Sequence, residues 1–385
     1  MIEIMEDAGH QAFIVGGAVR DSKLKRSIGD IDIATSAFPT DIIELFPKVI
    51  PTGLQHGTVV VRYQHVSFEV TTFRTESGYS DFRRPDHVQF VSNLTDDLAR
   101  RDFTINAMAM SKSYDMIDPF KGMTDLQSRL IRTVGDPNER FSEDSLRIMR
   151  AVRFQSQLGF KIETKTKHAM AHQGKGLGHI AIERLATEWY KTITGDFIAD
   201  AMETLFQTEI YQYLPVISKH THIQNMLANH SSPFISMPVF IAYMNWFVPK
   251  VTISDWIREW KLSNQVKNDS KLLIHLLKQY EQEPLEWVLY QLPERLIKSY
   301  RFLLAHCLEE AIVVDCIQQV KESLVIDSRS ELAINGADII EMYPAREKGS
   351  WIQETIESIE MAVILKKVAN TKNGIREWLQ NDRNE

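Results

Sequence analysis

The sequence predicts an α+β fold in which short strands are confined to residues 1 to about 125 and helices form the remainder. Two β-branched runs, residues 57–63 and 66–73, flank a polar turn and indicate paired strands. A third apolar run, residues 11–15, leads into a glycine pair that opens a helix. From Thr124 onward the apolar residues recur mainly with helical spacing.

Length and composition favour a globular protein of two to four domains, since 385 residues exceed one compact core. The chain is 44% hydrophobic and 25% charged, as ordinary globular proteins are. Its net charge of -7 means that any surface for nucleic acid must be a local patch. The cysteines, Cys307 and Cys316, are too few for a disulfide scaffold. Early acidic residues and the lack of an 18-residue apolar run predict no signal peptide, no membrane span and a cytoplasmic location.

Asp30 and Asp32 are the first candidate functional residues. They lie in a predicted strand over residues 28–34, where side chains at i and i+2 point the same way. The two carboxylates would therefore share one face, while Ile31 and Ile33 face the core. Two hard oxygen ligands side by side suit Mg²⁺, which binds through one or two carboxylates and substrate phosphates. Glu69 in the 66–73 strand is either a third acid or an edge-strand surface residue.

The glycine pair Gly16-Gly17 suits phosphate binding, because glycine lets backbone approach closely and a helix N-terminus carries free N–H groups. Arg20 in the following helix can add a charge-assisted contact. The polar segment at residues 74–86 is predicted to be a loop that is either a solvated connection or a functional, phosphate-facing segment. Arg101 follows a predicted helix at residues 93–100 and abuts an apolar segment, which favours an anion partner.

Residues 142–154 are predicted to form one helix with Ser142 as its N-cap. Every third residue from 144 is charged, in the order Asp144, Arg147, Arg150 and Arg153, and consecutive members of such a row are neighbours. Surface ion pairs would explain the row, although they contribute only tenths of a kcal/mol.

Hydrogen-bond geometry offers a functional explanation of the row. A carboxylate only accepts and a guanidinium only donates, so Asp144 and Arg147 complement the amino group and ring nitrogen of cytosine and of adenine. Guanine and uracil present the reverse pattern, and each mismatched buried group costs roughly 1–3 kcal/mol. Such a pair could select C and A without a nucleic-acid template.

The spacing of glycines and aspartates resembles the polymerase-beta-like nucleotidyltransferase superfamily, and five motifs together resemble bacterial class II CCA-adding enzymes, which are tRNA nucleotidyltransferases. The likeness is strong over residues 12 to 195. The motifs are GGAVRD with DIDIATSA at residues 16–37, HGTVVV with FEVTTFR at 56–74, RRDFTINAMA at 100–109, IDPFKG at 117–122, and EDSLRIMRAVRF at 143–154.

This resemblance implies a catalytic head with a small mixed β-sheet at residues 1–126, followed by an all-α neck at 127–190, body at 191–310 and tail at 311–385. It implies that Asp30 and Asp32 bind Mg²⁺ and catalyse, and that Gly17, Arg20 and Arg101 meet the triphosphate. Asp144 and Arg147 would read the base, and Arg150 and Arg153 would complete the nucleotide pocket. Residues 74–86 match the family's flexible loop. Residues 344–351 depart from the Gly-Pro-rich family tail.

The predicted activity is template-independent addition of C, C and A to the 3′ end of tRNA from CTP and ATP, with two metal ions assisting and pyrophosphate released. The expected partners are the tRNA acceptor and TΨC arm, ATP and CTP, with no membrane, and the chain would act as a monomer or homodimer. A poly(A) polymerase or an A-adding enzyme with the same head is the alternative enzyme. The non-enzymatic alternative is an RNA-binding protein with an inactive head.

Overall fold

The computed structural model describes residues 1–78 and 87–381, and the chain forms two compact units. Unit 1 comprises Met1–Phe234 with Arg258–Lys261, and unit 2 comprises Ile235–Ile257 with Leu262–Glu385. This division is coarser than the four predicted domains, so boundaries after residues 126, 190 and 310 stay predictions. No helix among the described residues is long and apolar enough to cross a bilayer.

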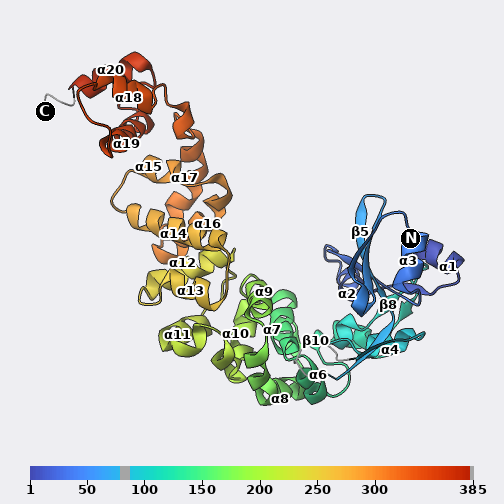
Figure 1. Ribbon diagram of the computed structural model, residues 1–385. Coiled ribbons are helices and arrows are strands. Elements are labelled where there is room, and N and C mark those ends of the chain that lie inside the picture. The colour runs from blue at the N-terminus through green and yellow to red at the C-terminus, as the bar shows by residue number, and fades with distance from the viewer. Residues whose placement is uncertain (79–86, 382–385) are drawn as a thin grey trace. The chain divides into compact units, whose positions relative to one another are not determined.

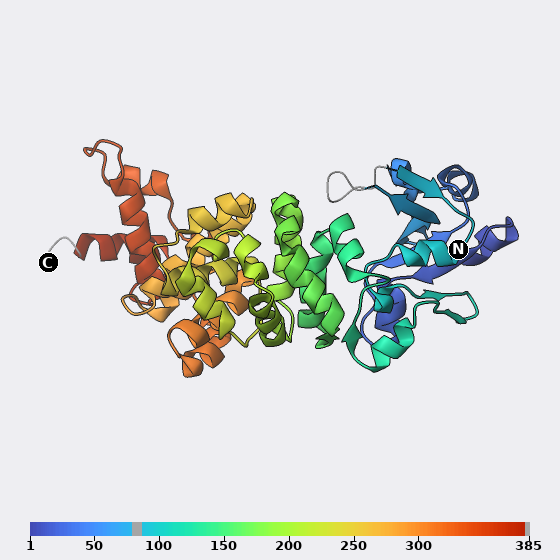
Figure 2. The same cartoon turned by 90° about the horizontal axis from the view of Figure 1, so that it is seen from below.

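Strands gather at the N-terminal, blue end of the chain and helices follow, which confirms the predicted α+β fold (Figures 1 and 2). The strands of the main sheet are β1 (Ala12–Val15), β2 (Ile31–Thr35), β3 (Val49–Gly53), β4 (Thr58–Tyr63), β5 (Val66–Thr72), β8 (Ala109–Met110) and β9 (Met116–Ile117). Within the described residues their order is β3-β4-β5-β2-β1-β8-β9. β2 and β5 run parallel and the other neighbours antiparallel, so the sheet is mixed.

Alternation along β2 sends Ile33 and Ala34 into separate cores on the two faces of the sheet. The helices of this region are α1 (Ile2–Asp7), α2 (Gly17–Lys23), α3 (Pro39–Leu45), α4 (Leu94–Ala99) and α5 (Gly122–Gln127). Ile33 packs with Ile42 of α3, whereas Ala34 packs with Leu98 of α4. The predicted strand at 28–34 begins later than expected, at Ile31, so Asp30 immediately precedes it.

The predicted loop at residues 74–86 is partly wrong. Its start forms strand β6 (Arg74–Ser77), which pairs antiparallel with β7 (His87–Phe90). The Arg74 side chain is held there by Glu76, at 2.8 Å, so polar residues without an apolar period still build a strand. Residues 79–86 of the predicted loop lie outside the described residues.

The rest of unit 1 is helical apart from the short parallel pair β10 (Leu130–Ile131) and β11 (Lys161–Ile162). Its α-helices are α6 (Pro137–Glu143), α7 (Leu146–Leu158), α8 (Thr164–Gln173), α9 (Ile182–Ile193), α10 (Ile198–Gln207) and α11 (Thr221–Ala228). Helix α7 packs against both α9 and α10, and its apolar side is buried.

The single helix predicted over residues 142–154 is wrong, because α6 ends at Glu143 and α7 starts at Leu146. Asp144 between them has an extended backbone, with φ -137° and ψ 99°. Ser142 is not an N-cap; its hydroxyl donates to the Glu139 carbonyl. The N-cap of α6 is Asp136, whose carboxylate accepts from two backbone N–H groups of the first turn.

Unit 2 is entirely helical in its described part. The α-helices from residue 237 onward are α12 (Met237–Phe247), α13 (Ile253–Glu259), α14 (Asn264–Gln279), α15 (Leu285–Tyr290), α16 (Ile297–Cys307), α17 (Ala311–Glu322), α18 (Gly336–Met342), α19 (Trp351–Ile364) and α20 (Lys372–Asn381). Ile339, Ile359 and Ile375, from α18, α19 and α20, share one core near the C-terminus.

Candidate functional site

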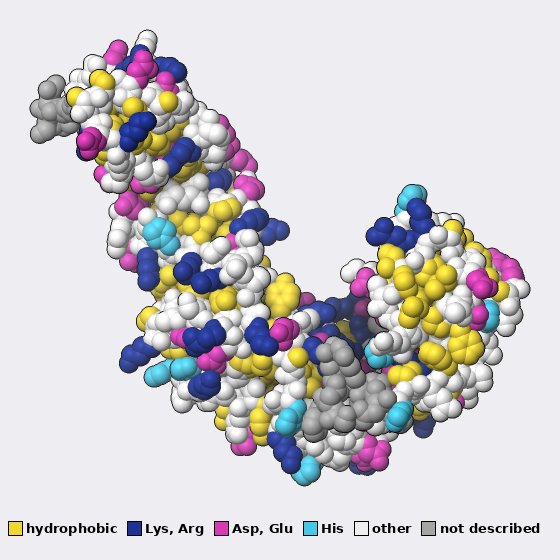
Figure 3. All heavy atoms as spheres, in the orientation of Figure 1, with side chains coloured by type: hydrophobic (Ala, Val, Ile, Leu, Met, Phe, Trp, Pro, Cys, Tyr) yellow, Lys and Arg dark blue, Asp and Glu magenta, His cyan; other side chains and the backbone are white. Residues whose placement is uncertain are grey.

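A cavity of about 700 Å³ in unit 1 brings together all nine predicted site residues. Dark blue Lys and Arg side chains line a hollow in the space-filling view (Figure 3). The predicted residues that line the cavity, called the pocket below, are Gly17, Arg20, Asp30, Asp32, Arg101, Asp144, Arg147, Arg150 and Arg153. They come from α2, β2, α7 and the segments beside them, so residues up to 136 positions apart converge.

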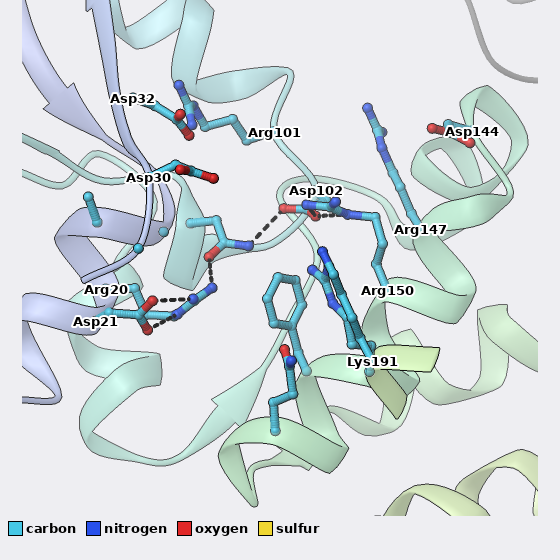
Figure 4. A pocket seen from close by; sticks show the side chains of 18 of the residues that line it. Arg20, Asp21, Asp30, Asp32, Arg101, Asp102, Asp144, Arg147, Arg150 and Lys191 are labelled. Atoms are coloured by element: carbon cyan, nitrogen blue, oxygen red, sulfur yellow. Dashed lines mark hydrogen bonds and ion pairs between the residues drawn. The ribbon is translucent and has the colours of Figure 1, made fainter. Parts of the chain in front are cut away.

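Asp30, Asp32 and Arg101 lie together at one end of the pocket (Figure 4). The turn that leads there depends on Gly16, which has φ 71° and ψ -132°. A Cβ on Gly16 would lie 2.9 Å from Nη1 of Arg101 and 3.7 Å from Oδ2 of Asp32. Only glycine therefore combines this backbone conformation with such close approach of both side chains.

The Asp32 carboxyl is electrostatically unusual. Burial, the Glu69 carboxylate and Asp30 raise the pKa of Asp32 from 3.8 to about 6, against the opposing effect of Arg101. Nearby positive charge therefore does not fully offset the cost of ionising Asp32. A cation bound beside the carboxylate would stabilise its ionised form.

Glu69 lies directly opposite Asp32 in the parallel pairing of β2 with β5. Since β5 lies between β4 and β2, the edge-strand interpretation of Glu69 is wrong. The Glu69 side chain is nevertheless exposed, and the described residues contain no group of three or more His, Cys, Asp or Glu arranged to hold a metal ion. Two carboxylates remain, a donor set that fits Mg²⁺ when substrate phosphates complete its coordination.

A chain of hydrogen bonds crosses the floor of the pocket from α2 to α7 (Figure 4). Arg20 donates to both oxygens of Asp21, at 2.9 and 2.8 Å, and to Oδ1 of Asn106 at 2.7 Å. Asn106 donates to Asp102 at 3.1 Å, and Arg150 donates to the other Asp102 oxygen at 2.6 Å. Burial alone would raise the pKa of Asp102, but Arg150 and Asn106 lower it to about 2. The Asp102 carboxyl is thus ionised at neutral pH and joins α2 to α7 through Asn106 and Arg150.

Phe154 presents its ring to three guanidinium groups that line the pocket. The central carbons of Arg20, Arg150 and Arg153 lie 4.9, 5.6 and 4.1 Å from the ring centroid. Burial and the neighbouring Arg150 lower the pKa of Arg153 to about 10, although Glu188 pairs with it at 3.2 Å. The ring keeps these arginines in place without neutralising them.

Asp144 and Arg147 lie on the other side of the pocket from Asp32 (Figure 4). The two side chains are held by different partners. Oδ1 of Asp144 accepts from the Leu146 N–H at 3.0 Å, and Oδ2 accepts from Arg184 at 3.1 Å. Arg147 donates to Glu143 at 2.7 Å and to the Arg100 carbonyl at 3.1 Å. The break before α7 therefore places Asp144 outside the helix that carries Arg147, while both side chains line the pocket.

Several pocket residues had no place among the predicted site residues. They include Asp102 and Asn106 in the floor, Phe154, Arg184 and Lys191. Asp102 and Asn106 belong to the quoted RRDFTINAMA motif, so this motif was the available signal. Arg184 and Lys191 lie seven residues apart on α9, about two turns, and nothing in the sequence separates them from other polar residues of an amphipathic helix.

Family models that match three stretches of the chain define it as a nucleotidyltransferase. Residues 12–132 match the family model of the poly A polymerase head domain. Residues 159–220 match the model described as the probable RNA and SrmB-binding site of polymerase A, and residues 239–379 match tRNA nucleotidyltransferase domain 2.

Curated relatives identify the family within this class. The chain is 42% identical to the CCA-adding enzyme of Oceanobacillus iheyensis, over 96% of this chain and 93% of that one. It is 41% identical to the CCA-adding enzyme of Anoxybacillus flavithermus, over 98% and 95%. The solved structure of the Bacillus stearothermophilus CCA-adding enzyme in complex with CTP aligns with a TM-score of 0.87 at 36% identity, covering 100% of this chain and 96% of that chain. The protein belongs to the CCA-adding enzyme family.

Proposed function

We propose that this protein adds C, C and A to the 3′ end of tRNA, using CTP and ATP in the cytoplasm. The observation that carries the proposal is the single pocket in which the Asp30–Asp32 end faces donors and acceptors from the start of α7. The first end suits metal-bound phosphates, and the second suits the edge of a base. The relatives named above carry this activity in their names.

In the proposed reaction the 3′-hydroxyl oxygen of tRNA attacks the α-phosphorus of the nucleotide. A new P–O bond forms, the bond to the β-phosphate breaks, and pyrophosphate leaves while the hydroxyl proton is released. Asp30 and Asp32 would hold Mg²⁺, which when bound makes the hydroxyl more acidic and neutralises phosphate charge. Gly17 provides close backbone approach, and Arg20 and Arg101 orient the triphosphate through charge-assisted hydrogen bonds.

Base choice would come from Asp144 and Arg147. Asp144 accepts from the amino group of cytosine or adenine, and Arg147 donates to the adjacent ring nitrogen. Arg150 and Arg153 complete the nucleotide site, their guanidinium groups being held by Asp102 and Glu188. The tRNA itself would be recognised by backbone and shape, because A-form RNA hides its base edges in a narrow groove.

The decisive experiment incubates the full-length protein with tRNA lacking its 3′ CCA, Mg²⁺ and each labelled nucleotide. We expect CTP to be incorporated first, ATP only after two cytidines, and GTP and UTP hardly at all. Repeated extension with ATP alone would indicate a poly(A) polymerase instead. A chain that binds tRNA yet incorporates nothing would indicate an inactive head.

Proton uptake by Asp32 should compete with Mg²⁺. Because the folded-state pKa of Asp32 is about 6, raised from 3.8, we expect Mg²⁺ binding to weaken as the pH falls through about 6. Without metal the sign for folding is opposite: the raised pKa favours the folded state at low pH, and this contribution is lost as the pH rises from about 4 to about 6.

The shift in Tm caused by Mg²⁺, measured at several pH values between 5 and 8, checks this expectation. The shift should be larger at the upper end of that range than at the lower. In Asp32→Asn the shift should be small and insensitive to pH. An equal Mg²⁺-induced shift at both ends of the range in the unmodified protein would contradict the prediction.

A further inference from the structure

Asp97 of α4 is a buried carboxylate that lies behind the pocket and contacts two arginines that line it. The Asp97 side chain is 0% exposed and does not line the pocket itself. Its Oδ2 accepts from Nη2 of Arg101 at 3.3 Å, and its Oδ1 accepts from Nε and Nη2 of Arg100 at 3.0 and 2.8 Å. Burial alone would raise the pKa of Asp97, but Arg100 and Arg101 hold it below its ordinary value.

The contact with Asp97 determines where the other nitrogen of Arg101 lies. Nη1 of Arg101 is the atom that approaches Gly16 so closely, beside Asp32. Nε of Arg101 is buried and has no hydrogen-bond partner among the described residues. Within the described chain, Asp97 is the one side chain to which Arg101 donates a hydrogen bond. Without this carboxylate the guanidinium would be free to rotate away from the Asp30–Asp32 end.

Arg100 connects Asp97 with strand β6 and also contacts Arg147. Its Nη1 donates to Glu76 at 3.2 Å, and Glu76 also accepts from Arg74 at 2.8 Å, so β6 is attached to Asp97 through Arg100. The Arg100 carbonyl accepts from Arg147, the proposed base-reading donor. The Asp97 carboxylate thus holds the side chain of Arg100, the residue whose backbone carbonyl accepts from Arg147.

We propose that Asp97 is a positioning residue of the nucleotide site. It holds the Arg101 guanidinium beside Gly16 and Asp32, and it binds the side chain of Arg100, whose backbone carbonyl accepts from Arg147. Asp97 touches no substrate in this proposal and acts only through the two arginines. The inference rests on the proposed function for its catalytic readout, but its binding readout requires only that the pocket takes Mg²⁺-CTP.

The test compares Asp97→Asn, Arg101→Ala and the double variant in the full-length protein. Asp97→Asn keeps the shape of the side chain but removes its charge and one acceptor. We expect it to lower kcat/KM for CTP roughly 10- to 100-fold, as loss of a supporting residue does around other sites. In the Arg101→Ala background the same change should cost less than about 3-fold, because the two residues act as one unit.

Asp125→Asn is the matched control. Asp125 is also a buried carboxylate of unit 1, accepting from Thr104 at 2.6 Å and Arg132 at 3.1 Å, but neither it nor these two partners line the pocket. It should lower Tm without a comparable loss of kcat/KM. If Asp97→Asn reduces kcat/KM by the same factor with and without Arg101, or no more than Asp125→Asn does, the carboxylate merely supports the fold and the proposal is wrong.

Calorimetric titration with CTP and Mg²⁺ separates this inference from the proposed function. Asp97→Asn and Arg101→Ala should weaken CTP binding by similar factors, and their effects should not multiply, whether or not tRNA is extended. Arg101→Lys provides a second variant should Asp97→Asn fail to fold, because a lysine lacks the fork that bridges Asp97 and the pocket. CTP affinity equal to that of the unmodified protein in either variant would refute the positioning role. Absence of incorporation alone would count only against the proposed function.

Discussion

Asp32→Ala is expected to abolish nucleotide incorporation while leaving the protein folded. Loss of one of two acidic ligands removes charge stabilisation of several kcal/mol, which corresponds to a rate loss of about 1000-fold or more. The fold should tolerate the change, because the ionised Asp32 is disfavoured by burial and by Glu69. The measurement is Mg²⁺-dependent incorporation of labelled CTP into tRNA that lacks CCA, together with Tm.

Glu44→Ala serves as the control for this experiment, since Glu44 is an exposed carboxylate on α3 of the same region. It should retain full activity. Substantial incorporation by Asp32→Ala at an unchanged Mg²⁺ requirement would show that the metal is held elsewhere.

Asp144→Ala and Arg147→Ala are expected to relax the choice among the four nucleotides. Each change removes one contact that pairs with C and A but clashes with G and U, so discrimination should fall by roughly 1–3 kcal/mol, or about 5- to 150-fold. The ratio of kcat/KM for CTP to that for UTP measures the effect. Both variants should also incorporate CTP more slowly, because the base is no longer oriented.

Lys165→Ala, an exposed change on α8, should alter neither the rate nor the ratio. A CTP-to-UTP ratio that survives in both pocket variants would assign base selection to other residues. Arg184 would then be the first to examine, because it donates to Asp144 from α9.

The local sequence was sufficient to predict those elements in which polar and apolar residues alternate with the period of the secondary structure. The alternation around Asp30 and Asp32 placed two carboxylates beside a strand, and the apolar run at residues 11–15 forms β1 before the glycine pair. The paired strands around the 64–65 turn are present as β4 and β5. In these stretches the apolar residues recur with the period of the element and are the residues that become buried. The local sequence is therefore enough to predict the element.

Elsewhere the deciding interactions are tertiary. Ser142 followed by two acids resembles an N-cap, yet the helix begins after Asp136, at Pro137. Asp144 has an extended backbone, and its carboxylate accepts from the Leu146 N–H and from Arg184. Residues 74–77 have no apolar period, and they form a strand because β7 and ion pairs support them. Arg20 and Asn106 are 86 positions apart, and Asp102 and Arg150 are 48 positions apart, so these contacts across the pocket become apparent only when distant segments meet.

The pairing of the pocket arginines has a consequence for how ionic strength affects ligand binding. Arg20, Arg101, Arg147, Arg150 and Arg153 each already contact a carboxylate, in the order Asp21, Asp97, Glu143, Asp102 and Glu188. The cavity thus combines many directed donors with little excess charge, and it should collect few counterions for an arriving triphosphate to displace. Added salt should therefore weaken nucleotide binding less than it weakens binding of the tRNA backbone, whose affinity depends on counterion release.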